Sequence, residues 1–90
     1  MVRIGDVATF PYAKADKEQA KKILEESAEV FGALQSLKEQ PWSISRTEAL
    51  RDECADVIQA VANMLAAIGV EDFTGDMERC EARNRERGRL

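Results

Sequence analysis

Acidic side chains occur as matched pairs in two segments of the sequence. Glu26 and Glu29 stand three residues apart, and Glu53 and Asp56 repeat this spacing further along the chain. Residues three apart lie on one side of a helix, about one turn from each other. If both segments are helices that pack as a hairpin, the four carboxylates converge and repel one another. A divalent cation with oxygen ligands, Mg2+ or Mn2+, relieves that repulsion.

A solvated helix face is the ordinary interpretation of acidic residues on a helix. Lys21 and Lys22 precede Glu25 and Glu26 by four residues, the spacing of ordinary ion pairs. The repetition of the acidic pair in the second segment favours a metal site instead. The chain contains no His, which excludes Ser–His and Cys–His catalysis. Cys54 falls in an apolar stripe, where a free thiol is expected to pack.

The first acidic pair lies in a predicted helix that follows an N-terminal arm. Residues 1–15 show no clear period and are predicted to form an extended arm. Asp16, with Gln19 three residues later, resembles a capping box that opens a helix. This helix runs to about Glu39, because Pro41 disfavours helical geometry in the residue before it.

Two further helices are predicted downstream. Ser45 and Glu48 form a second capping-box pattern, which opens a helix that Gly69 ends. A third helix starts near Thr74, with acidic residues at its start and basic residues towards its end, and Gly88 terminates it. No segment shows the apolar–polar alternation of a strand, so the fold class is predicted to be all-α.

Each long helix carries an apolar stripe that is predicted to form the core, with the acidic pair on one flank. In the first helix the stripe consists of Ala20, Ile23, Ser27, Val30, Phe31, Leu34 and Leu37. In the second helix it consists of Leu50, Cys54, Val57, Ile58, Val61, Leu65 and Ile68. Asn63 extends the polar flank of the second helix beyond Asp56.

Size and charge restrict the possible partners. Ninety residues form one domain, with an arm (1–15) and a helical core (16–88). A chain this short buries roughly 60–65% of its unfolded surface, so a homodimer or homotetramer is expected. The net charge of −4 argues against binding to a nucleic acid polymer. Without a membrane-spanning run or a signal-peptide pattern, a cytoplasmic protein with reduced cysteines and no membrane contact is expected.

The acidic pattern resembles that of a known family. Glu25, Glu26 and Glu29 read EExxE, and after 23 intervening residues Glu53 and Asp56 read ExxD. Together with the two predicted helices, this pattern is similar to the signature of the MazG-like all-α nucleotide pyrophosphohydrolases over the helical core. The resemblance implies a helical bundle of the all-α NTP pyrophosphatase type, completed by oligomerisation. It also implies an enzyme that uses Mg2+ to hydrolyse a nucleoside triphosphate to the monophosphate and pyrophosphate.

The same resemblance implies roles for the acidic residues. Glu26, Glu29, Glu53 and Asp56 would be the Mg2+ ligands, and Glu25 would hold a second ion or orient the attacking water. Metal ions and carboxylates suffice for this chemistry, because attack on a phosphoanhydride needs the triphosphate charge neutralised and a water placed in line.

Substrate-binding residues are implied outside the acidic pairs. Arg83, Asn84 and Arg87 resemble the phosphate-contacting residues of the family's last helix, although a Lys that is common there is absent. A solvated helix end that complements the macrodipole is an equally good interpretation of these residues. Asn63 falls where the family lines its nucleotide pocket. Trp42, between the first two helices, either stacks on a base or caps the bundle, and the cap is favoured.

Two alternative functions remain open. A phosphoribosyl-ATP pyrophosphohydrolase of histidine biosynthesis shares the helical acidic signature, but the short chain and the RNRERGRL tail favour the stand-alone MazG-like group. A non-catalytic helical dimerisation or adaptor module is the other alternative, and the intact EExxE and ExxD patterns argue against it. No base-reading motif is visible, so the base and sugar preferences stay open.

Overall fold

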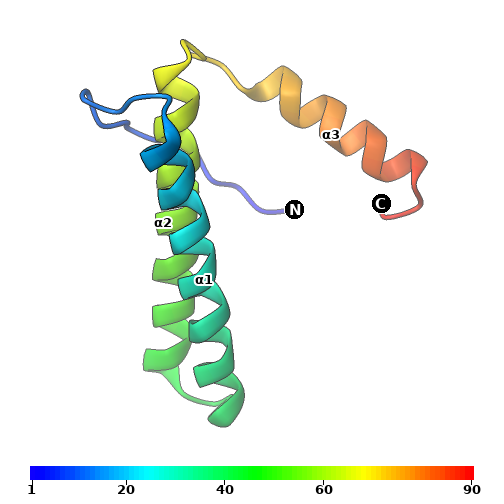
Figure 1. The fold of residues 1–90 in the computed structure, drawn as a ribbon. Coiled ribbons are helices and arrows are strands. Elements are labelled where there is room, and N and C mark those ends of the chain that lie inside the picture. Colours follow the sequence, from blue (N-terminus) through cyan, green and yellow to red (C-terminus); the bar gives the residue numbers. More distant parts are fainter.

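The computed structural model describes residues 1–90 and contains three helices and no strand, which confirms the predicted all-α fold (Figure 1). The helices are α1 (Lys17–Glu39), α2 (Ile44–Ala67) and α3 (Thr74–Glu86). α1 and α2 run antiparallel and side by side as a hairpin. α3 leads away from the end of α2 and packs against neither of them. None of the three helices combines the length and the apolar character that a membrane span requires.

α1 begins at the predicted capping residue. Asp16 has an extended backbone, and its Oδ1 accepts a hydrogen bond from the backbone N–H of Gln19 at 2.9 Å. The side chain of Gln19 does not complete a capping box. Its Nε2 instead donates to the carbonyl oxygen of Ala60 at 2.9 Å, which ties the first turn of α1 to α2.

α2 begins two residues before the predicted start. Its N-cap is Ser43, whose Oγ accepts a hydrogen bond from the backbone N–H of Arg46 at 3.2 Å, and Ser45 lies inside the first turn. The reason is the turn that precedes it: the N–H of Ser43 donates to the carbonyl of Gln40 at 3.0 Å. This turn ends at Ser43 with the extended backbone that an N-cap needs.

The later helix ends agree with the sequence. Gly69 and Gly88 both have positive φ, at 86° and 75°, just after α2 and α3 respectively. α3 begins at Thr74 as predicted, and the Thr74 N–H donates to Oδ1 of Asp72 at 2.9 Å. Hydrogen bonds from the side chain and backbone of Thr74 lower the pKa of Asp72. This local network stabilises the start of a helix that has no tertiary contact with α1 or α2.

The hairpin covers only part of the predicted apolar stripes. Ile23, Val30 and Leu37 of α1 are partly buried, whereas Phe31 is 64% exposed and Leu34 is also exposed. In the second stripe, Cys54 and Ile58 of α2 and Ile68, which follows α2, are exposed. The stripes are too wide for one neighbouring helix to cover, because a two-helix contact is a narrow seam. The prediction that the whole stripe forms a core is therefore wrong for the single chain, and Cys54 is not packed within it.

The buried residues are few and mostly polar. Ala60 is the single buried apolar residue, and the two others are Glu26 and Asn63. Both polar residues lie on the side of their helix that faces the hairpin partner or the arm. Two of the three buried side chains in this chain are therefore polar, and their contacts are described below.

Candidate metal centre

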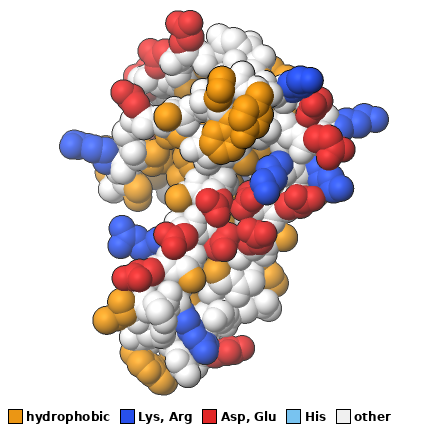
Figure 2. All heavy atoms as spheres, turned by 90° about the vertical axis from the view of Figure 1, so that its left-hand side faces the viewer, with side chains coloured by type: hydrophobic (Ala, Val, Ile, Leu, Met, Phe, Trp, Pro, Cys, Tyr) orange, Lys and Arg blue, Asp and Glu red, His pale blue; other side chains and the backbone are white.

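Four carboxylates from the two hairpin helices meet at one place. Ligand oxygens of Glu26, Glu29, Glu53 and Asp56 all lie within 4.8 Å of one another; we call these four residues the acidic cluster. Antiparallel packing brings the two i, i+3 pairs together, as the sequence predicts. Figure 2 shows acidic side chains gathered at mid-height of the molecule, with hydrophobic side chains exposed above and below them.

The acidic cluster contains carboxylate oxygens that no protein group satisfies. Glu26 is only 7% exposed and Glu53 is partly buried, although carboxylates are seldom buried without a partner. The Oε2 atoms of both residues are buried and have no hydrogen-bond partner. An unsatisfied buried polar atom is costly, and more so when it is charged. Two such oxygens therefore lie within one cluster and could act as ligands of a cation.

One lysine partly compensates the negative charge. Nζ of Lys22 lies 2.9 Å from Oε1 of Glu26, one helical turn away. The hydrogen bond from Lys22 lowers the pKa of Glu26, and the same bond raises the pKa of Lys22. A single ammonium group faces four carboxylates, so the cluster keeps an excess of negative charge.

Glu29 shows the effect of this excess. The adjoining carboxyl group of Glu53, and then that of Glu26, raises the pKa of Glu29 from 4.5 to about 7. The negative charges of both neighbours act in the same direction. In the absence of a cation, the cluster therefore retains a proton on Glu29 near neutral pH.

We expect the metal-free protein to lose stability as the pH rises from about 4.5 to about 7. The folded chain holds a proton on Glu29 in this window, whereas the unfolded chain has released it. The free energy of unfolding therefore falls as the pH rises. Glu26, whose pKa is lowered, contributes a change of opposite sign below pH 4.5, outside this window.

Urea denaturation in EDTA at about pH 5 and about pH 8 measures this loss. Glu29→Gln should make the free energy of unfolding nearly independent of pH between these two values, because the amide does not titrate. Asp52→Asn alters an exposed carboxylate of α2 outside the acidic cluster. This variant should lose as much stability between the two pH values as the unmodified protein does. If Glu29→Gln lost as much stability between the two pH values as the unmodified protein, Glu29 would not be the titrating group.

The acidic cluster fits a hard divalent cation. All of its donors are oxygens, and no Cys or His belongs to it. These four carboxylates would hold the ion, because their ligand oxygens lie within 4.8 Å of one another.

Glu25 lies outside the acidic cluster. Its Oε1 is 3.9 Å from Nζ of Lys21, and both side chains are more than half exposed. This is the i, i+4 ion pair that the ordinary interpretation of the sequence describes. Of the five acidic residues singled out in the sequence, four are brought together and Glu25 points elsewhere.

Asn63 is buried next to the N-terminal arm. It is 3% exposed, and its Oδ1 accepts hydrogen bonds from the backbone N–H of Phe10 and from Nε2 of Gln59, both at 3.0 Å. Nε2 of Gln59 also donates to the carbonyl oxygen of Ala8 at 2.8 Å. In this chain Asn63 therefore anchors the arm on α2.

Asn63 was predicted to line a nucleotide pocket, whereas Gln59 and the contact of both residues with the arm were not predicted. Gln59 and Asn63 are polar residues four apart in the otherwise apolar stretch IQAVANML. That spacing places both side chains on one face of α2, and a polar pair on an apolar face could have indicated a specific contact there.

The basic residues near the C-terminus lie apart from the acidic cluster. Arg83, Asn84 and Arg87 are on α3 or just after it, and α3 contacts neither hairpin helix. Nδ2 of Asn84 donates to the carbonyl of Cys80 at 3.0 Å, and its Oδ1 accepts from Arg89 at 3.2 Å. Within one chain these residues do not reach the carboxylates.

Trp42 lies in the turn between α1 and α2, at the opposite end of the hairpin from the N-terminal arm. It is 79% exposed, so the predicted cap on the bundle is not formed within the single chain. In the comparisons with known proteins, no family model, curated protein or solved structure matches the chain.

Proposed function

We propose that this protein is a Mg2+-dependent nucleotide pyrophosphohydrolase that cleaves a nucleoside triphosphate to the monophosphate and pyrophosphate. The observation that carries the proposal is the pair of buried, unpartnered carboxylate oxygens of Glu26 and Glu53 within a cluster of four carboxylates. The resemblance of EExxE and ExxD to the MazG-like pattern supports the choice of substrate and reaction.

In this proposal the chain supplies the ligands and positions the water. Glu26, Glu29, Glu53 and Asp56 bind Mg2+, or Mn2+, which when bound neutralises the phosphate charge and activates a water molecule. For Glu25 to orient the attacking water, its side chain must leave the ion pair with Lys21 and turn toward the acidic cluster. The water oxygen bonds to the α-phosphorus, the bond to the bridging oxygen breaks, and pyrophosphate leaves. The proton of the water passes to a carboxylate and then to solvent.

Pyrophosphate release from a panel of nucleoside triphosphates tests this proposal. The panel contains canonical and modified nucleotides and phosphoribosyl-ATP, each with Mg2+, with Mn2+ and with EDTA. Metal-dependent release with the monophosphate as co-product is the expected result. Release from phosphoribosyl-ATP alone would assign the alternative reaction, and no release from folded, metal-bound protein would favour a non-catalytic adaptor.

We also propose that the chain self-associates through its exposed apolar residues. Leu24, Phe31, Leu34 and Ile58 are exposed on the hairpin, and only one apolar residue is buried in the single chain. Exposed apolar area of this kind marks an interaction surface, and a chain of this size gains its missing core most simply from copies of itself. A homodimer or homotetramer follows.

Sedimentation velocity is expected to show a dimer or tetramer for the unmodified chain. Phe31→Ser should shift the protein toward monomer and lower its melting temperature, because the ring contributes about 1.5–3 kcal/mol when it is fully buried. Val2→Ser is the matched control, since Val2 is an exposed apolar residue of the arm rather than the hairpin. A monomeric unmodified chain, or equal effects of both substitutions, would contradict the proposed interface.

A further inference from the structure

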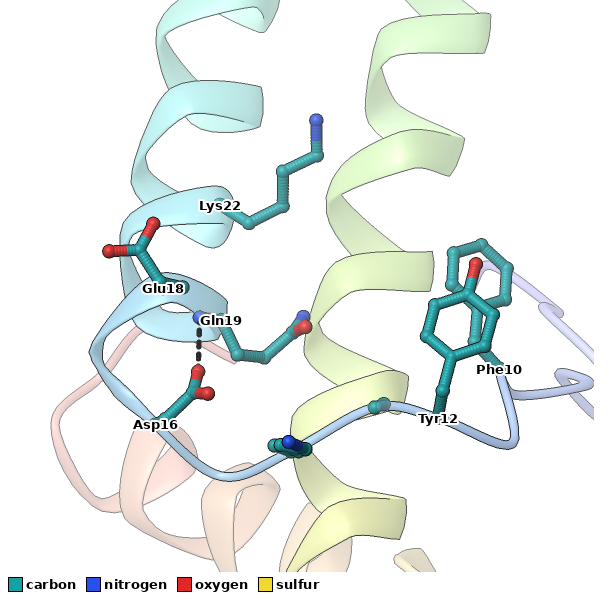
Figure 3. Close-up of a pocket in the computed structure, with 8 residues that line it drawn as sticks. Phe10, Tyr12, Asp16, Glu18, Gln19 and Lys22 are labelled. Carbon is teal, nitrogen blue, oxygen red and sulfur yellow. Dashed lines mark hydrogen bonds between the residues drawn. The ribbon is translucent and has the colours of Figure 1, made fainter.

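A hollow lies where the N-terminal arm crosses α2 and enters α1. Its volume is about 290 Å³, at the lower end of the range for small-molecule sites. Phe10, Tyr12 and Lys14 of the arm line it together with Gln19 and Lys22 of α1. Figure 3 shows the arm passing in front of α2, with the two aromatic rings on one side and Lys22 on the other.

Two aromatic rings stand together at this hollow. The ring centroids of Phe10 and Tyr12 are 5.8 Å apart and the ring planes are tilted by 35°. Tyr12 is 76% exposed, and Phe10 is also exposed. Neither ring is buried in a core, so their packing against each other leaves faces open to solvent. Open aromatic faces bind planar groups by stacking.

The arm is held in place by specific hydrogen bonds. The N–H of Phe10 donates to the buried side chain of Asn63, and Gln59 donates to the carbonyl of Ala8. A turn that follows, with the N–H of Ala13 donating to the carbonyl of Phe10 at 3.2 Å, carries Tyr12. The rings are therefore presented by a fixed backbone, and binding a ligand here requires little additional ordering.

The hollow adjoins the acidic cluster through one residue. Lys22 lines the hollow, and its Nζ is also 2.9 Å from Oε1 of Glu26. Lys22 and Glu26 are four residues apart on α1, which corresponds to about 6 Å along the helix axis. A ligand that occupied both the hollow and the acidic cluster would have a planar group at the arm and anionic groups near Lys22 and the carboxylates.

We propose that the hollow binds the base of the nucleoside triphosphate, and that Phe10 and Tyr12 are specificity-determining residues that stack on it. This inference rests on the proposed function, because the acidic cluster must hold the metal-bound phosphates. Lys22, between the two places, contacts the phosphate chain. The arm then distinguishes a nucleotide from an inorganic polyphosphate, whose phosphates reach the same cluster without a base to stack.

Calorimetric titration with two probes tests the role of the arm. One probe is an α,β-methylene nucleoside triphosphate, which is not cleaved at that bond, and the other is inorganic tripolyphosphate, each with Mg2+. Tyr12→Leu should weaken binding of the nucleotide analogue roughly 5- to 100-fold and leave tripolyphosphate binding within about twofold. Tyr12→Phe keeps the aromatic face and should retain binding. Trp42→Leu, which removes an exposed aromatic ring at the other end of the hairpin, is the matched control.

The outcomes separate this inference from the proposed function. Equal losses for both probes, or unchanged nucleotide binding in Tyr12→Leu, overturn base stacking by the arm. If the unmodified protein releases pyrophosphate and Tyr12→Leu binds the nucleotide normally, the arm inference fails and the proposed function stands. If the unmodified protein binds no nucleotide, both fail. A changed oligomeric state in Tyr12→Leu with both affinities unaltered assigns the rings to a contact between copies.

Discussion

Replacing Asp56 by Asn, or Glu53 by Gln, should lower Mg2+-dependent pyrophosphate release by at least about 100- to 1,000-fold. Each substitution keeps the shape of the side chain and removes a charged metal ligand from the acidic cluster. Metal stabilisation of the transition state is worth several kcal/mol, and each 1.36 kcal/mol corresponds to a factor of ten in rate. Glu26→Gln and Glu29→Gln, on the other hairpin helix, should have effects of similar size.

The measurement is kcat for the preferred nucleotide, together with far-ultraviolet circular dichroism to show that helicity is retained. Asp52→Asn is the matched control, because Asp52 precedes Glu53 on α2 but is exposed and outside the acidic cluster. Its activity should stay within about twofold of the unmodified protein, as surface changes have small effects. A fully active Asp56→Asn protein would overturn the assignment of the site.

The melting temperature should rise with Mg2+, and the acidic cluster should be responsible for the rise. A ligand present at about 100 times its Kd stabilises the folded state by about 2.7 kcal/mol. For a domain of this size, 1 kcal/mol shifts the melting temperature by about 4–8 °C, so a rise of roughly 10–20 °C follows. The buried Oε2 atoms of Glu26 and Glu53 are the atoms whose unfavourable burial the ion relieves.

Differential scanning calorimetry with Mg2+ and with EDTA measures the shift. Glu53→Gln should abolish it, whereas Asp52→Asn should retain it. In EDTA near pH 8, Glu29→Gln should melt no lower than the unmodified protein, because it removes repulsion from the metal-free cluster. If Mg2+ left the melting temperature unchanged at millimolar concentration, the cluster would be a purely structural feature and the adaptor alternative would gain support.

The helices and their ends were predictable because their signals are local. Asp16 caps α1, and Gly69 and Gly88 follow α2 and α3, where the pattern of the sequence places them. The exception is the start of α2. Ser43 and Ser45 are both suitable caps, and the turn after Pro41 selects the first of them. The choice depends on the path of the chain before the helix, which a capping pattern does not contain.

The convergence of the acidic pairs was also predictable, but their burial was not. The i, i+3 spacing and a short connection are enough to expect four carboxylates on adjoining faces of a hairpin. Helical periodicity places Glu26 on the flank of an apolar stripe, whereas the structure buries it in the seam between the helices. The rotation of each helix about its axis decides this difference, and that rotation is set by all the contacts between α1 and α2 together.

The sequence by itself determined the helical fold class, most helix ends and the two i, i+3 acidic pairs, because these follow from interactions and spacings within one or two helical turns. Only the tertiary structure decided that Glu26 and Glu53 have unpartnered buried oxygens, that Glu25 lies outside the cluster and that Asn63 anchors the arm. These facts depend on contacts between residues far apart in the chain, such as Phe10 and Asn63. Helical periodicity specifies the face on which a side chain lies, and the packing of that face specifies what the side chain meets.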